Sequence, residues 1–280
     1  MFEKLSNGWE LIKSSAQVLR EDTNLLVFPL LSGIACLFVL GSFALPLFLS
    51  GAFAIEGNVH QVTHNPLAYA VLFLFYFCSY FVIIFFNSAL VACAIIRFNG
   101  GTPTLSDGFQ AAMARMPQIL AWSLVSASVG FILKMIESRS ERVGEIVSGL
   151  LGLAWSVATF FVVPVIVVEK AGPFEAMKRS MAILKKAWGE AFVGNQGIGF
   201  FIGILAIAAA LPAVLGFMSG SGVAIAIGLA VTVSLEIALA IISAALHTIL
   251  LGALYVFAAE GRVPSAFDGG VLRSAFARRN

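Results

Sequence analysis

The chain is poor in charge. Asp, Glu, Lys and Arg make up 11% of its 280 residues, whereas hydrophobic residues make up 60%. Soluble domains carry about 25% charged residues. Almost every charge lies in a short segment between long apolar runs, which leaves no room for a separate soluble domain. A net charge of +2, with no basic stripe interleaved with aromatic residues, predicts no binding to nucleic acid.

The sequence also lacks the motifs on which hydrolysis and metal chemistry usually depend. It contains no Gly-x-Ser-x-Gly, no Walker loop, no His-Glu-x-x-His and no pair of acids inside the apolar runs. Cys36, Cys78 and Cys93 are well separated inside apolar runs, where we expect small packing residues rather than metal ligands. We therefore expect a protein that is not an enzyme and that needs neither a metal nor another cofactor.

Long apolar runs dominate what is present. A bilayer core of about 30 Å needs about 20 apolar residues in a helix. Only the last run contains a charge, Glu236. We predict an all-α, polytopic membrane protein that forms one integral domain over residues 1–280, with six transmembrane helices. The runs cover residues 25–53, 67–96, 117–133, 146–168, 191–217 and 223–259.

Basic residues between the runs predict the orientation of the chain. Fourteen Lys and Arg residues fall on the side that holds both termini, and three, Lys134, Arg139 and Arg142, fall on the other side. Cytoplasmic loops carry the excess of Lys and Arg. Both termini are therefore expected in the cytoplasm. The first 22 residues lack the pattern of a cleavable signal peptide.

A charge, a glycine and a proline follow each even-numbered run. Glycine suits the left-handed residue that ends a helix, and proline prevents the helix from continuing. We predict three repeat units, over 3–96, 104–168 and 173–259, each an interfacial helix followed by a transmembrane hairpin, and then a short amphipathic helix over 265–278. The alternative is that every short cytoplasmic loop needs such stops. The stops are Arg97 to Pro103, Glu169 to Pro173 and Glu260 to Pro264.

Residues 173–190 show the clearest amphipathic pattern. Apolar residues recur at steps of three and four, and basic residues occupy the other face. Such a helix lies in the membrane interface, so we predict a basic collar on the cytoplasmic side that contacts anionic lipid or organises partners. The apolar positions are Phe174, Met177, Met181, Leu184 and Trp188, and the basic positions are Lys178, Arg179, Lys185 and Lys186.

A family resemblance rests on residues 169–180 (EKAGPFEAMKRS), on Trp188, and on the segment from Ala253 to Phe276. These segments are similar to an uncharacterised bacterial family of multi-pass membrane proteins, a domain of unknown function. More distantly, they resemble the membrane domain attached to some glycerophosphodiester phosphodiesterases, whose catalytic barrel is absent here. The resemblance implies a helical fold in the bacterial inner membrane and carries over no catalytic residue.

Glu236, Ser243 and His247 fall on one face of the last run. Ionisable groups at membrane depth are costly and usually mark a site, so the alternative function is a transporter or channel for a small or amphiphilic solute. A protonated Glu236 that is hydrogen-bonded to a neighbouring helix explains the pattern equally. Glu236 is near mid-membrane if the turn at residues 219–221 anchors the run, whereas His247 is central if Glu260 anchors it.

Other polar and small residues predict contacts between helices. Asn87, Asn195 and Gln196 are candidates for interhelical hydrogen bonds. A stripe of small residues in the fifth run favours close helix packing, with a homo-oligomer interface as the alternative. Three prolines inside the runs predict kinks. A solvated loop is expected around Glu56, His60 and His64, with a metal site as the alternative. The stripe is Gly199, Gly203, Ala206 and Ala210, and the prolines are Pro46, Pro164 and Pro212.

Overall fold

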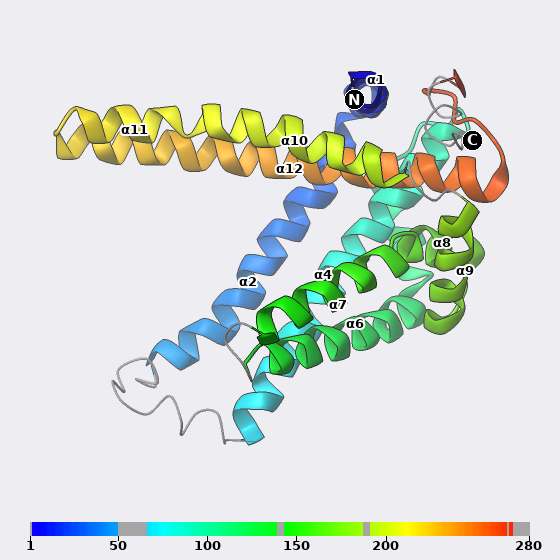
Figure 1. Cartoon of the computed structure of the whole chain (residues 1–280), viewed down its shortest axis with the longest axis horizontal. Coiled ribbons are helices and arrows are strands. Elements are labelled where there is room, and N and C mark those ends of the chain that lie inside the picture. Colours follow the sequence, from blue (N-terminus) through cyan, green and yellow to red (C-terminus); the bar gives the residue numbers. More distant parts are fainter. Residues whose placement is uncertain (1, 50–65, 139–142, 187–190, 268, 271–280) are drawn as a thin grey trace. The chain divides into compact units, whose positions relative to one another are not determined.

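The structure is a computed structural model that describes residues 2–49, 66–138, 143–186, 191–267 and 269–270. Within these residues every regular element is a helix (Figure 1), which confirms the all-α prediction. The helices are α1 (Phe2–Glu21), η1 (Thr23–Leu26), α2 (Val27–Leu49), α4 (Pro66–Phe98), α5 (Leu105–Met113), α6 (Met116–Glu137), α7 (Val143–Ala158), α8 (Val162–Glu169), α9 (Pro173–Lys186), α10 (Ala191–Ala209), α11 (Leu211–Met218) and α12 (Gly222–Glu260).

Six helical segments in the described part of the chain are long and apolar enough to cross a membrane. They correspond to the six apolar runs of the sequence. The chain divides into two compact units, which are described separately: the first comprises residues 1–29, 93–105 and 183–280, and the second residues 30–92 and 106–182.

In the first unit, α10 and α11 run antiparallel to α12 as a long hairpin (Figure 1). Glycines bring the two backbones together near its tip. A methyl group added at Gly216 would lie 2.7 Å from the carbonyl oxygen of Ala224, and one added at Gly228 would overlap the carbonyl oxygen of Pro212. Close approach through glycine increases van der Waals contact, which drives helix association in lipid.

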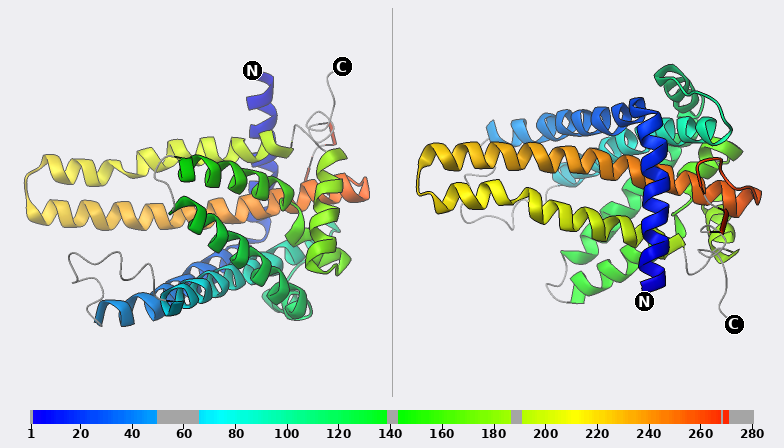
Figure 2. Two further views of the ribbon diagram at one scale, coloured as in Figure 1. Left: turned by 60° about the horizontal axis from the view of Figure 1, so that its bottom comes forward. Right: turned by 90° about the horizontal axis from the view of Figure 1, so that it is seen from above.

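Helix α1 crosses this hairpin, as both views in Figure 2 show. Its Trp9 ring lies 4.7 Å from the ring of Phe201 on α10. The buried residues of α1 recur at helical spacing and form its packed face: Leu11, Ile12, Ser15, Val18 and Leu19. Apolar packing across one stripe therefore holds α1 in place.

In the second unit, aromatic rings fill the contacts between helices. Tyr80 of α4 closes over Gly130 of α6, where an added methyl group would lie 3.1 Å from the phenol oxygen. The indoles of Trp122 and Trp155 stack with centroids 5.6 Å apart, which joins α6 to α7. An open groove of about 330 Å³ remains beside this stack. It is lined by Val129, Ile132, Leu133, Ile136, Leu151, Ala154, Trp155 and Ala158.

Two apolar runs that the sequence presents as continuous are each divided into two helices. The fourth run breaks between α7 and α8, three residues before Pro164, and the fifth breaks between α10 and α11, just before Pro212. Proline has no backbone N–H, so the hydrogen bond to the residue four positions earlier is lost. In contrast, α2 continues through Pro46 to Leu49.

Left-handed residues follow four of the described helices, and one of them is Gly220, which follows α11 with φ of 66°. Gly100 follows α4 with φ of 82°, and Gly261 follows α12 with φ of 69°, as the glycine stops predict. After α8, however, the left-handed residue is Lys170, with φ of 61°, rather than Gly172. The chain therefore turns two residues earlier than expected there. The order of elements fits three units, but the repeat and the interfacial helices stay predictions, and most of 265–278 lies outside the described residues.

Candidate lipid-contact surface

Helix α9 begins at Pro173, a residue suited to the first turn of a helix. Its Ala176, Ser180 and Ile183 side chains are fully or almost fully buried. The backbone N–H of Phe161, just before α8, donates a hydrogen bond of 3.0 Å to Ser180 Oγ. This N–H belongs to the start of a helix, where backbone donors have no intrahelical partner. Ser180 therefore fixes α9 against α8 and supplies a buried polar group with a partner.

An ion pair makes a second connection between these helices. Arg179 Nε lies 2.9 Å and 3.1 Å from the two carboxylate oxygens of Glu169, the last residue of α8. Both side chains are partly exposed, so the ion pair contributes little to stability and mainly orients α9 relative to α8. Arg179, predicted among the lipid-facing basic residues, thus has a partner within the protein.

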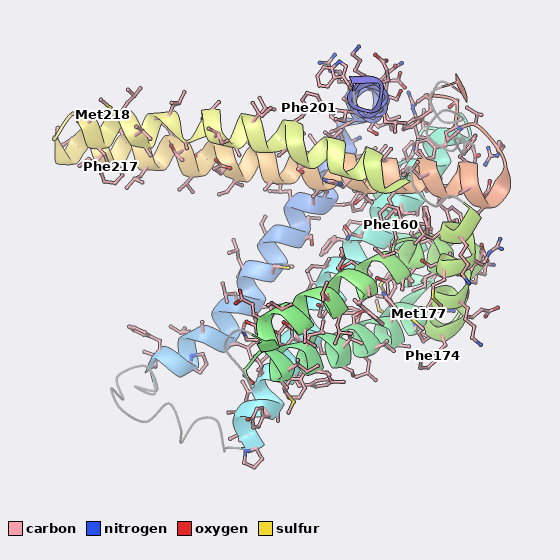
Figure 3. The ribbon with its side chains drawn as sticks, in the orientation of Figure 1. Phe160, Phe174, Met177, Phe201, Phe217 and Met218 are labelled. Atoms are coloured by element: carbon pink, nitrogen blue, oxygen red, sulfur yellow. The ribbon has the colours of Figure 1, made fainter. Side chains whose placement is uncertain are left out.

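The opposite side of α9 has no such docking role. Phe174 is 66% exposed, and Lys178 and Lys185 are exposed as well. An α-helix has 3.6 residues per turn, so each residue advances by about 100° around the axis. Phe174, Lys178 and Lys185 therefore lie within about 40° of one another around α9. We call Phe174, Lys178 and Lys185 the α9 surface. Phe174 and Met177 are labelled in Figure 3.

The α9 surface differs from the amphipathic pattern predicted by the sequence. The predicted apolar stripe is divided, because Phe174 is exposed whereas Leu184 is buried. The packed side consists of the small residues Ala176 and Ser180 together with Ile183 and Leu184. The aromatic ring therefore shares its face with lysines rather than lying opposite them. The Lys186 side chain and Trp188 lie outside the described residues.

A separate polar junction lies in the first unit, where the ends of α1, α4 and α12 meet. Arg97 of α4 donates to Glu21 and lies 3.2 Å from Asp22. Arg262, just after α12, donates to Asn99 Oδ1 at 2.6 Å. The hydrogen bond from Arg97 lowers the pKa of the Glu21 carboxyl, with a smaller contribution from Gln17.

The polar face predicted on α12 is divided among different environments. Thr232 Oγ1 accepts a hydrogen bond of 3.1 Å from the N–H of Ala213, at the break between α10 and α11, so its role is to complete the hairpin. Glu236 and Ser243 are half-buried on the same helix, and His247 is half-buried and has an interaction partner. Within the residues that the structure describes, the Glu236 carboxylate forms no hydrogen bond or ion pair.

The other residues predicted to form contacts between helices do not come together in one site within the described part of the chain. Asn87 is half-buried in α4 and has no hydrogen bond or ion pair to any described residue. Methyl groups added at Gly199 and Gly203 would meet nothing within 4 Å, so the close packing expected at this stripe occurs instead at Gly216 and Gly228. The side chains of Asn195 and Gln196 and the residues Glu56, His60 and His64 lie outside the described part.

Metal coordination finds no support in the described ranges. There, no three His, Cys, Asp or Glu side chains lie close enough together to hold a metal ion. Sequence reasoning missed the pairing of Ser180 with Phe161, since a serine in a basic amphipathic helix carries no signal of what it contacts. The Glu169–Arg179 pair was equally hidden, because their spacing of ten residues crosses a turn whose shape depends on Lys170.

The fold and these surfaces define a multi-pass helical membrane protein. The comparison with protein families identifies its relatives: the chain belongs to a family of unknown function (DUF6159), whose pattern matches residues 66–265. No curated protein matches the chain. Membership agrees with the resemblance to an uncharacterised family and assigns no activity.

Proposed function

We propose that this protein is a non-enzymatic protein of the bacterial inner membrane, with both termini in the cytoplasm, that contacts anionic lipid through the α9 surface. The observation that carries the proposal is an exposed phenylalanine on the same face as two exposed lysines, on a helix whose other side is docked on the protein. Such a face suits the boundary between acyl chains and headgroups.

Electrostatic attraction between the lysines and an anionic leaflet sets the expected strength of lipid binding. Each lysine near a negatively charged leaflet contributes about 1 kcal/mol, and the contribution falls off within about 10 Å at moderate salt. Lys178 and Lys185 have no ion pair with a described residue, so both are able to attract phosphate. Docking by Ser180 holds α9 before lipid binds, which lowers the entropic cost of the contact.

Lipid selectivity tests the proposal. The full chain is reconstituted in vesicles, and spin-labelled phosphatidylglycerol is compared with spin-labelled phosphatidylcholine in the shell of motionally restricted lipid. We expect the wild type to prefer phosphatidylglycerol and a Lys178→Gln/Lys185→Gln variant to lose about fivefold or more of that preference.

A matched control removes the same charge elsewhere. Lys13 and Lys134 are each paired with a glutamate three residues away, Glu10 and Glu137. A Lys13→Gln/Lys134→Gln variant has the same net charge as the test variant and is expected to keep most of the preference. An equal loss of phosphatidylglycerol preference in the two variants would show that lipid selectivity depends on net charge alone. That result would contradict a dedicated α9 surface.

Transport of a solute remains the competing prediction. It depends on a water-accessible route to Glu236, and no observation in the described residues favours such a route. The groove beside Trp155 has an apolar lining that does not include Glu236. The α9 surface is therefore the better supported basis for a function.

A further inference from the structure

The hairpin of the first unit provides a scale for membrane depth. Two contacts bracket its register: the backbone of Pro212 lies against Gly228, and the backbone N–H of Ala213 donates to the Thr232 side chain. Because the helices are antiparallel, moving back along α10 to Phe201 moves forward along α12 by the same number of residues. Phe201, and with it the crossing helix α1, therefore lies level with about residues 239–244 of α12.

The part of the hairpin beyond α1 has the length of one hydrocarbon layer. The span from Phe201 to Met218 contains 18 residues. At about 1.5 Å per residue this is about 27 Å, against a hydrocarbon thickness of about 30 Å. Figure 3 places Phe217 and Met218 at the tip and Phe201 beside α1. Large apolar side chains are exposed along this length, including Ile207, Val214, Val223 and Val233.

Helix α1 has the side chains expected at the edge of that layer. Trp9 is 41% exposed, and the Lys13 ammonium lies 5.8 Å from the centre of its ring. Tryptophan and lysine are enriched where hydrocarbon meets headgroups. Along α12, exposed apolar residues extend to Ile242, and the buried stretch begins at Ala245, at the same level. Both patterns place the hydrocarbon boundary at α1.

This boundary decides between the two depths that the sequence leaves open. Glu236 precedes the level of α1 by three to eight residues, which is about 5–12 Å along the helix. The carboxylate is thus nearer to the headgroups on the α1 side than to the far surface. A helical side chain leans toward the N-terminus of its helix, which for α12 is the tip of the hairpin, so a headgroup has to reach inward to meet the carboxylate.

The hairpin itself provides no cation for Glu236. The sequence has no Lys or Arg from residue 187 to residue 261. Lys13 of α1 already pairs with Glu10 at 2.9 Å. An ionised Glu236 therefore needs a cation from outside the hairpin, and the nearer layer that offers one is the headgroups on the α1 side.

We propose that Glu236 binds the primary ammonium group of an aminophospholipid from the leaflet on the α1 side. An ammonium group donates hydrogen bonds to a carboxylate, and such charge-assisted bonds are stronger than neutral ones. A quaternary ammonium has no N–H to donate, so phosphatidylcholine is a poorer ligand for the same site. The proposal concerns a zwitterionic lipid on the hairpin and is independent of the α9 surface.

Retention of defined lipids by the full chain tests this site. The purified protein is held in detergent to which equal amounts of phosphatidylethanolamine and phosphatidylcholine with matched acyl chains are added, and bound lipid is measured by native mass spectrometry. We expect the wild type to retain phosphatidylethanolamine, and Glu236→Gln to reduce that retention about tenfold. Ser234→Ala, an exposed position two residues away on α12, is the matched control and should retain it fully.

Gln has the shape of Glu, so Glu236→Gln is expected to fold, and its elution and melting temperature are compared with the wild type. The wild-type comparison of the two headgroups stands even without a variant. Equal retention of the primary and quaternary headgroups by the wild type would overturn the proposal. Unchanged retention in Glu236→Gln would also overturn it, since the carboxylate would then play no part.

Discussion

The α11–α12 and α6–α7 hairpins are similarly apolar, yet their helices are joined in different ways. In the first, Gly216 and Gly228 bring backbone against backbone. In the second, Trp122 stacks on Trp155 and leaves an open groove beside the stack. Lipid tails are as apolar as leucine, so burial alone does not favour either pairing. Complementary shape favours each pairing, through small residues in the first hairpin and stacked aromatic rings in the second.

The helices α1 and α9 are also held in place in different ways. Apolar side chains hold α1 against α10 and α12. In contrast, a buried hydrogen bond and an ion pair hold α9 against α8. Polar docking fixes the rotation of α9 about its own axis, because Ser180 bonds to the Phe161 N–H and Arg179 pairs with Glu169. That fixed rotation determines which residues form the α9 surface.

Gly228→Ala is expected to have the largest effect on stability. The added methyl group overlaps the Pro212 carbonyl oxygen, and backbone cannot move aside as a flexible side chain can. Overpacking of this kind costs about 1–3 kcal/mol. Unfolding in detergent measures it. Gly203→Ala is the control: its methyl group meets nothing, and alanine favours the helix by about 0.5–1 kcal/mol. Equal destabilisation by both changes would contradict backbone contact in the hairpin.

Ser180→Ala tests the polar docking of α9. The change removes the acceptor of the buried Phe161 N–H, which we expect to lower the free energy of unfolding by about 1 kcal/mol or somewhat more. Protease sensitivity of α9 should rise with it. Ser156→Ala is matched to it, since Ser156 is exposed and, among the described residues, bonds to Gly152 of its own helix. A loss no greater than that of Ser156→Ala would mean that the hydrogen bond does not hold α9.

Trp155→Ala addresses the stacked hairpin and should have a smaller effect. Lipid tails are able to enter the enlarged groove, so the expected loss is mainly that of the aromatic pair, about 0.5–1.5 kcal/mol. Indole fluorescence of Trp122, measured in a chain whose Trp9 and Trp188 are replaced by Phe, reports the change. Leu153→Ala, on an exposed position of the same helix, provides the comparison. A loss of several kcal/mol would show that the second hairpin is packed as tightly as the first.

Acidification tests the polar junction of the first unit. The pKa of Glu21 is lower in the folded protein than its ordinary value, so its pairing with Arg97 stabilises the fold above that ordinary value. The contribution is lost as the pH falls through the lowered pKa. Glu21→Gln should therefore reduce the acid sensitivity of α1 in hydrogen exchange. Identical pH profiles for variant and wild type would exclude this pairing as the cause.

Sequence patterns predicted the apolar spans well, because the composition of a transmembrane helix is dictated by the bilayer. They predicted faces less well. On α9, both lipid and protein accept apolar groups, so periodicity could not tell that Leu184 is buried and Phe174 exposed. The breaks before Pro164 and Pro212 depend on whether neighbouring helices replace the lost hydrogen bonds, and Pro46 shows that a break is not automatic.

The Glu236 candidate shows what the sequence could and could not decide. A single acid in an apolar run is visible in the sequence, whereas its depth is not, because the last run is longer than a bilayer requires. Only the crossing of α1 at Phe201 gives a reference level. The role of Thr232 in joining α11 to α12 was equally hidden, since it depends on a helix break elsewhere.

The most direct test of the α9 surface is the environment of Phe174 in the bilayer. A spin label is attached at Phe174→Cys, in a chain whose three native cysteines are replaced, and a second label at exposed Glu175→Cys serves as the comparison. If α9 contacts the membrane surface as proposed, a nickel chelate carried on lipid headgroups should relax the label at 174 more than the label at 175. Equal relaxation of both labels by a water-soluble chelate, with no preference for the lipid-bound one, would contradict the proposed contact.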